Sequence, residues 1–336
     1  MSDIYNQVVK RLSHIFKSVL TRQHKLLPAS PSRLFGWALY RTPKGPSQIS
    51  RGVSVRDNLL WEQFDVITFS FVSGNFNQHA KVLEVIAQWM MFTNITFQRV
   101  EFEGDIRISF DDEDASWSCM GRACYRKNRG QPTMNLEGIR CSTPGVDEEE
   151  RAIILHEFGH ALGFLHEHQS PARVDILEFD DQNIHKYYQR CQGWSHKDIE
   201  ENVIQIHSTK WMGNYSGFDP QSIMMYPIYP SFNRQELEIP HNTVLSDVDK
   251  AYAMIHYARV LPHESAPQWT IAHTLDILGV QGEFRDKILK TNDAKEIRRL
   301  FTEWNSSERL GDTGGFFRPL RVATRKWSKC LRCRSS

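Results

Sequence analysis

Strand-like and helix-like patterns of apolar residues alternate in the first half of the chain. Residues 66–72 are rich in β-branched and aromatic side chains, and residues 94–100 and 104–110 alternate apolar with polar positions, so each segment predicts a strand. Residues 75–91 instead carry apolar side chains at spacings of three and four, which predicts a helix. The order strand, helix, strand, strand predicts a mixed sheet covered by helices, an α+β fold.

The pattern divides the chain into four regions. Residues 1–54 are basic and then rich in proline, which predicts an N-terminal extension and linker. Residues 55–260 contain the predicted sheet and form the main domain. Residues 261–312 regain helical spacing, which fits either a small accessory domain or helices that complete the main core. Residues 313–336 contain basic residues and no acid, which predicts a basic tail.

Composition excludes several classes of protein. Hydrophobic residues make up 40% of the chain, enough for a core, and 41 basic against 40 acidic residues give no strong case for nucleic-acid binding. No apolar run reaches the roughly 18 residues of a membrane span. The first thirty residues lack the apolar centre of a secretory signal. Six cysteines are too few for a disulfide-built miniprotein, and their pairing stays open.

A buried helix is predicted around residue 155. Four successive acids, residues 147–150, suit the positive end of a helix dipole. An apolar stripe at helical spacing follows them and comprises Ile154, Phe158, Ala161, Leu162 and Leu165.

The same helix carries candidate metal ligands. His156 and His160 are four residues apart, so they lie on one helical face and can bind one Zn²⁺. Gly163 can turn the chain sharply and bring His166 back as a third ligand. Glu157 lies on the adjacent side, within reach of a metal-bound water. The competing interpretation, buried histidines without a metal, is weakened by five fixed positions over eleven residues.

Three neutral ligands leave one position of a zinc ion open, which is typical of catalytic sites. The metal lowers the pKa of a bound water toward about 7, and a neighbouring carboxylate can accept the proton. The sequence therefore predicts one catalytic Zn²⁺ per chain, held by His156, His160 and His166, with Glu157 as the general base.

These residues resemble the metzincins, zinc peptidases that share HExxHxxGxxH and a downstream methionine turn. Ser222–Tyr226 (SIMMY) resembles that turn, and the resemblance implies that Met224 forms an apolar floor beneath the histidines. Glu167 and the SIMxY sequence are most similar to the astacin and matrixin-like groups. The resemblance to astacins implies that Tyr226 is an additional zinc ligand that stabilises the oxyanion, and that Glu167 is structural.

The resemblance also implies a zincin-like fold: a twisted mixed sheet with an edge strand, an active-site helix and an irregular C-terminal subdomain. The segment that resembles the substrate-binding edge strand is Ile106, Arg107, Ile108, Ser109 and Phe110. An extended peptide added to such an edge gains backbone hydrogen bonds whatever its side chains are.

The predicted function is that of a zinc-dependent metalloendopeptidase acting on polypeptides, and we expect a monomer. The alternative is a catalytically silent zincin-fold module that binds peptides. A nucleic-acid-binding function would rest only on the two basic ends of the chain. The compartment stays open, because the family resemblance implies secretion whereas the amino terminus predicts no signal.

Overall fold

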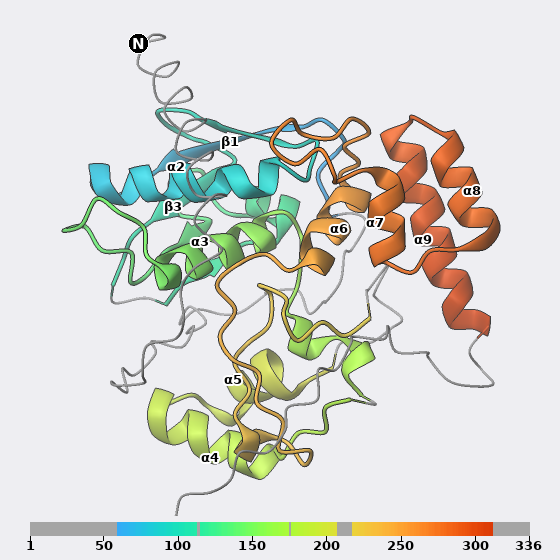
Figure 1. The fold of residues 1–336 in the computed structure, drawn as a ribbon. Helices are drawn as coiled ribbons and strands as arrows, with labels where there is room; N and C mark the ends of the chain where they lie inside the picture. Colours follow the sequence, from blue (N-terminus) through green and yellow to red (C-terminus); the bar gives the residue numbers. More distant parts are fainter. Residues whose placement is uncertain (1–58, 113–114, 175, 207–216, 312–336) are drawn as a thin grey trace, which may run out of the picture. The chain divides into compact units, whose positions relative to one another are not determined.

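The chain is described by a computed structural model (Figure 1). The described residues are 59–112, 115–174, 176–206 and 217–311. All of the described residues belong to one compact unit. The predicted extension of residues 1–54 and the basic tail of residues 313–336 lie outside the described residues.

The regular elements follow in chain order. The strands are β1 (Val66–Phe71), β2 (Thr96–Arg99), β3 (Ile106–Ser109), β4 (Trp117–Ser118) and β5 (Met134–Asn135). The α-helices are α2 (Phe76–Met90), α3 (Glu148–Ala161), α4 (Asp181–Gln192), α5 (His196–Ile199), α6 (Asp247–His256), α7 (Ile271–Ile277), α8 (Gly282–Lys290) and α9 (Ala294–Gly311). Short helical turns are η1 (Gly121–Arg126), η2 (Glu167–Gln169), η3 (Pro171–Arg173), the π-helical η4 (Glu200–Ile204) and η6 (Pro230–Phe232).

The strands form one mixed sheet in the described part of the chain, in the order β2-β1-β3-β5-β4. The pairs β1–β2, β1–β3 and β3–β5 are parallel, whereas β4 runs antiparallel to β5. The mixed sheet and its first three strands are confirmed. The helix predicted over residues 75–91 is also confirmed, as α2, which Asn75 caps.

The prediction that Ile106–Phe110 forms the edge strand is wrong. β3 pairs with β1 on one side and with β5 on the other, and all four of its residues are buried. At this end of the sheet the outermost strand is β4, Trp117–Ser118. The sequence could not separate the two cases, because strand order depends on pairing with β5, more than twenty residues further on.

Helices α2 and α3 pack against each other, as Figure 1 shows. The indole Nε1 of Trp89 on α2 donates to the carbonyl of Leu155 on α3 at 3.0 Å. On α3, the ring of Phe158 meets Phe69 of β1 and Phe97 of β2 edge-on, with centroids 6.5 and 5.2 Å apart. Because these side chains are buried together, α3 is held against the sheet.

The C-terminal helices share the core of the main domain. Leu275 of α7, Ile288 of α8 and Phe301 of α9 belong to the same hydrophobic cluster as the sheet. The guanidinium of Arg298 on α9 donates to the carbonyls of Trp61 and His256. For residues 261–312, these contacts favour helices that complete the main core over a separate accessory domain. The boundaries of the four regions stay a prediction. Among the described residues, no helix has both the length and the apolar character that a bilayer crossing needs.

Candidate active site

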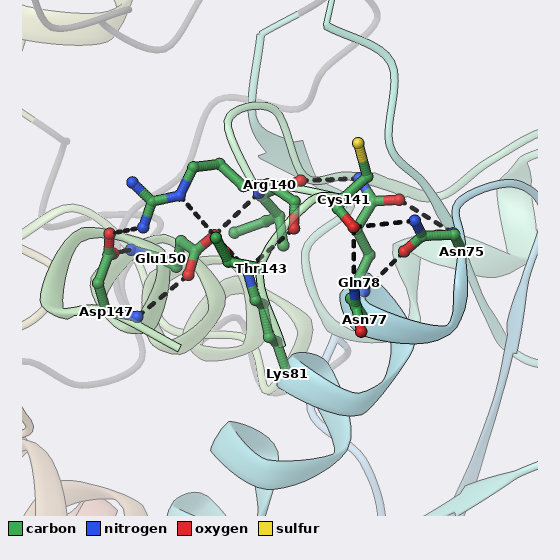
Figure 2. Close-up of polar contacts among 10 residues, drawn as sticks. Asn75, Asn77, Gln78, Lys81, Arg140, Cys141, Thr143, Asp147 and Glu150 are labelled. Carbon is green, nitrogen blue, oxygen red and sulfur yellow. Dashed lines mark hydrogen bonds and ion pairs between the residues drawn. The ribbon is translucent and has the colours of Figure 1, made fainter. Parts of the chain in front are cut away.

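A buried polar network fixes the start of α3 (Figure 2). Asp147 caps the helix, and Glu150 completes the capping box by accepting from the backbone of Asp147. The ammonium of Lys81 on α2 lies 2.6 Å from Glu150, with 0% and 2% of the two side chains exposed. Lys81 also donates to the carbonyl of Arg140 and the hydroxyl of Thr143. The network therefore joins α2, the preceding loop and the start of α3.

A sharp turn ends α3, as the sequence predicts. Gly163 has a φ of +98°, a conformation that favours glycine, and the amide of Phe164 donates back to the carbonyl of Gly159 at 2.9 Å. Trp61 Nε1 donates to the carbonyl of Ala161 at 2.7 Å, which satisfies another carbonyl of the last turn. The chain thereby reverses beside the helix instead of extending it.

The turn brings the three predicted ligands together. His156, His160 and His166 each offer a ring nitrogen, and these nitrogens all lie within 4.8 Å of one another. The ring centroids are 4.7 Å apart for His156–His160 and His160–His166, and 5.3 Å apart for His156–His166. Two of the ligands come from α3 and the third from the segment after the turn.

The hydrogen bonds of the three rings suit a bound metal. His156 Nδ1 donates to the carbonyl of Ile223 at 2.8 Å, and His160 Nδ1 to that of Phe164 at 2.7 Å. His166 Nδ1 donates to Gln169 Oε1 at 3.2 Å. These bonds place the proton of each neutral ring on Nδ1 and leave Nε2 as the lone-pair donor.

A cation explains a contact that hydrogen bonding does not. The Nε2 atoms of His160 and His166 lie 3.1 Å apart. With both protons on Nδ1, these two lone pairs face each other without a hydrogen between them. A divalent ion coordinated by both nitrogens turns this repulsion into attraction, so the residues present fit Zn²⁺.

Burial tunes the ionisable groups of the site. It lowers the pKa of His156 and His166 well below the usual value and that of His160 to about 4. Neutral imidazole is the form that binds a metal. Burial also raises the pKa of the Glu157 carboxyl well above its usual value, and a nearby divalent cation would oppose that rise.

The methionine turn lies against the zinc helix. A Cβ on Gly159 would lie only 2.4 Å from Met224 Sδ, so glycine allows the sulfur to approach α3. The amide of Glu167 donates to the carbonyl of Met224 at 3.0 Å. The ring of Tyr226 lies 4.5 Å from that of His166 between centroids. The structure thus places Tyr226 beside His166 and Met224 against α3 at Gly159.

Sequence reasoning missed the carboxylate that holds this turn. Asp249 on α6 accepts from the hydroxyl of Ser222 and the amide of Ile223, both at 2.7 Å. It also accepts from the amide of Ser246 as part of the α6 capping box. The capping pattern was readable in the sequence, but its second partner, 26 residues away, was not.

Gln169 was also missed. Its amide oxygen accepts from His166, while its Nε2 donates to the carbonyls of Glu201 and Gln205 at 2.8 and 3.1 Å. Gln169 is therefore held by the backbone of η4 and of the residue after it, and it orients His166. A glutamine three residues after a histidine carries no sequence signal of this role.

A zinc helix, a glycine turn and a methionine turn around converging histidines define a metzincin-type metallopeptidase. The model of the peptidase family described as Astacin matches residues 54–258. The chain belongs to this family, and its catalytic domain is that of a zinc-dependent metalloendopeptidase with Zn²⁺ as its cofactor.

Individual relatives agree with the family assignment. Over 187 residues, 56% of this chain and 87% of the relative, the chain is 27% identical to Astacin-like metalloprotease toxin 5 of Loxosceles gaucho. It is 30% identical over 126 residues to Zinc metalloproteinase dpy-31 of Brugia malayi, covering 37% of this chain and 19% of that protein. The structure of myroilysin matches 61% of this chain and 98% of its own, with 33% identity and a TM-score of 0.57.

Proposed function

We propose that the chain cleaves polypeptides at the site formed by His156, His160, His166 and Glu157. The observation that carries the proposal is the convergence of the three imidazoles beside a buried carboxylate. Zn²⁺, when bound, supplies a Lewis acid that polarises the scissile carbonyl and acidifies water. The three histidines are its ligands, and Gln169 holds His166 in its coordinating orientation.

Glu157 acts as the proton carrier. It follows the ligand His156 on α3 and is 1% exposed, and its Oε2 has no hydrogen-bond partner among the described residues. A buried carboxylate without a competing donor is suited to take a proton from the attacking water. The same group then returns that proton to the leaving amine, which completes general acid–base catalysis of one hydrolysis.

Tyr226 and Met224 support the reaction differently. The phenol ring of Tyr226 packs against His166, so its hydroxyl is a candidate donor to the developing oxyanion. Met224 is buried below α3 and keeps the histidine cluster dry and fixed.

The substrate pairs with β4 in this proposal, in place of the strand named from the sequence. β4 is the terminal strand of the sheet, antiparallel to its neighbour β5. An extended peptide can therefore add to its outer edge through backbone hydrogen bonds. This mode of binding tolerates many side chains, as an endopeptidase requires.

The test is Glu157→Gln in the full chain. We expect the variant to keep its zinc and to lose hydrolysis of a denatured protein such as casein by about 10²–10⁴-fold, since only the proton carrier is removed. Glu149→Gln, at an exposed position in the first turn of α3, is the matched control and should retain activity. Full activity of Glu157→Gln would refute the assignment.

The silent-module alternative makes the opposite prediction, namely bound zinc and no cleavage by the wild type. No observation favours it over the peptidase. The chain spans only 20% and 19% of two of its relatives, so the substrates and partners of the whole protein, and its monomeric state, are also proposals.

A further inference from the structure

A second cluster of metal-binding side chains lies outside the active site. His185 on α4, His196 on α5 and Glu200 at the start of η4 each offer one ligand atom, and these atoms lie within 4.8 Å of one another. Helices α4 and α5 are in contact and are labelled close together in Figure 1. The cluster shares no residue with the three histidines beside Glu157.

The helical backbone places two of the ligands on one face. α5 continues directly into η4, so His196 and Glu200 are separated by one helical turn. Ser195 and Asp198 form a capping box that fixes where this segment begins. His185 faces the pair from α4, and its Nε2 lies 2.9 Å from Glu200 Oε1.

The hydrogen bond between His185 and Glu200 accounts for only one of the two ring nitrogens of His185. His185 Nδ1 is buried and has no hydrogen-bond partner among the described residues. The rings of His185 and His196 are stacked, with centroids 3.9 Å apart. The histidine rings of the active site are 4.7–5.3 Å apart, so metal capture requires His196 to rotate away from His185. His196 is exposed, which leaves its side chain room to rotate.

We propose that His185, His196 and Glu200 bind a second divalent cation, Zn²⁺, which clamps α4 to the α5–η4 segment. Two imidazoles and one carboxylate are a donor set that zinc accepts with a fourth position open to water. Zinc is the cation of choice because it already serves the peptidase site of the same chain.

The clamp would act on the active site through η4. The carbonyls of Glu201 and Gln205, directly after Glu200 and at the end of η4, accept from Gln169 Nε2. Gln169 in turn accepts from His166. A cation that fixes η4 therefore also fixes the carbonyls that hold Gln169, and Gln169 orients His166, a ligand of the catalytic zinc. The role of this second ion is structural.

The experiment measures the zinc content of the full chain after saturation with Zn²⁺ and gel filtration. We expect two zinc ions per chain in the wild type, one in His196→Ala and one in Glu200→Gln. His273→Ala, which removes another exposed histidine, is the matched control and should keep both ions. His160→Ala should retain one ion, and adding His196→Ala to it should remove that ion.

Two results would overturn the proposal. A single zinc in the wild type, unchanged by His196→Ala, would show that the cluster is only a hydrogen-bonded contact between α4 and η4. Two ions that persist in both His196→Ala and Glu200→Gln would place the second ion elsewhere. Neither result depends on peptidase activity, so failure here is distinguishable from failure of the Glu157 assignment.

Discussion

Gly159 and Met224 show how closely the zinc helix and the methionine turn fit at the scale of single residues. Met224 is 3% exposed, and its sulfur occupies the space where a side chain at position 159 would begin. The motif HExxH allows any residue type at position 159. The methionine below the helix is what restricts it here.

We therefore expect Gly159→Ala to destabilise the fold by about 1–3 kcal/mol, because the added methyl group overpacks a filled core. Peptidase activity should fall because Met224 is pushed away from the zinc helix that carries two of the ligands. Urea unfolding and kcat/KM on a peptide substrate measure the two effects. Gly145→Ala is the control, since a Cβ there meets nothing within 4 Å. Equal stability of the two variants would contradict the packing argument.

Gln169 tests the orientation of a ligand. Gln169→Ala removes the acceptor of His166 Nδ1, and losing a hydrogen bond that orients a metal ligand costs about 10–100-fold in metal affinity or activity. Competition with a chelator measures the zinc affinity. Gln131→Ala, which truncates an exposed glutamine, should leave that affinity unchanged. An unaltered affinity in Gln169→Ala would mean that His166 needs no such support.

At the scale of elements, α3 depends on an ion pair as well as on its apolar stripe. The contact between Lys81 and Glu150 is fully buried and joins two helices near the cap of the zinc helix (Figure 2). Without Lys81, the buried carboxylate of Glu150 keeps as its cation partner the guanidinium of Arg140, whose Nε lies 3.5 Å away on a half-exposed side chain. Losing a fully buried partner is far more costly than losing a surface pair.

Lys81→Met should therefore lower the free energy of unfolding by about 3–5 kcal/mol. Arg129→Met breaks an ion pair with Glu103 whose side chains are 83% and 60% exposed, and it should cost no more than about 1 kcal/mol. Denaturant unfolding of both variants compares the two costs. If they were similar, the buried pair would not anchor α3.

The same scale shows what the sequence could and could not predict. The zinc helix, its glycine turn and α2 were predictable, because periodicity, capping and turn residues are local signals. The interior place of β3 was not, because alternation does not reveal which strands lie on either side. Asp249 and Gln169 escaped notice for a related reason: each acts on backbone or side-chain atoms of a segment that only folding brings near.

At the scale of the whole molecule, one buried histidine lies where the end of α6 meets α9. His256 is 1% exposed, its ring packs against Tyr252 and Phe301, and the Arg298 guanidinium donates to its carbonyl. Burial, with the nearby Arg298 charge, lowers the pKa of His256 to about 3. The neutral ring is thus the form that the folded core accepts.

This shift predicts how acid acts on the fold. The unfolded chain binds a proton at His256 near pH 6.5, whereas the folded chain does so only near pH 3. Stability contributed by His256 is therefore present above pH 6.5 and is lost as the pH falls toward 3, by an amount on the order of 4 kcal/mol. His256→Gln, which stays neutral, should flatten the pH dependence of unfolding in this window even if it is less stable at pH 7. His273→Gln removes an exposed histidine and should keep the wild-type slope. Denaturant unfolding at a series of pH values measures the free energy of unfolding for each variant. If this free energy changed with pH in parallel for wild type and His256→Gln, the acid sensitivity would belong to other groups.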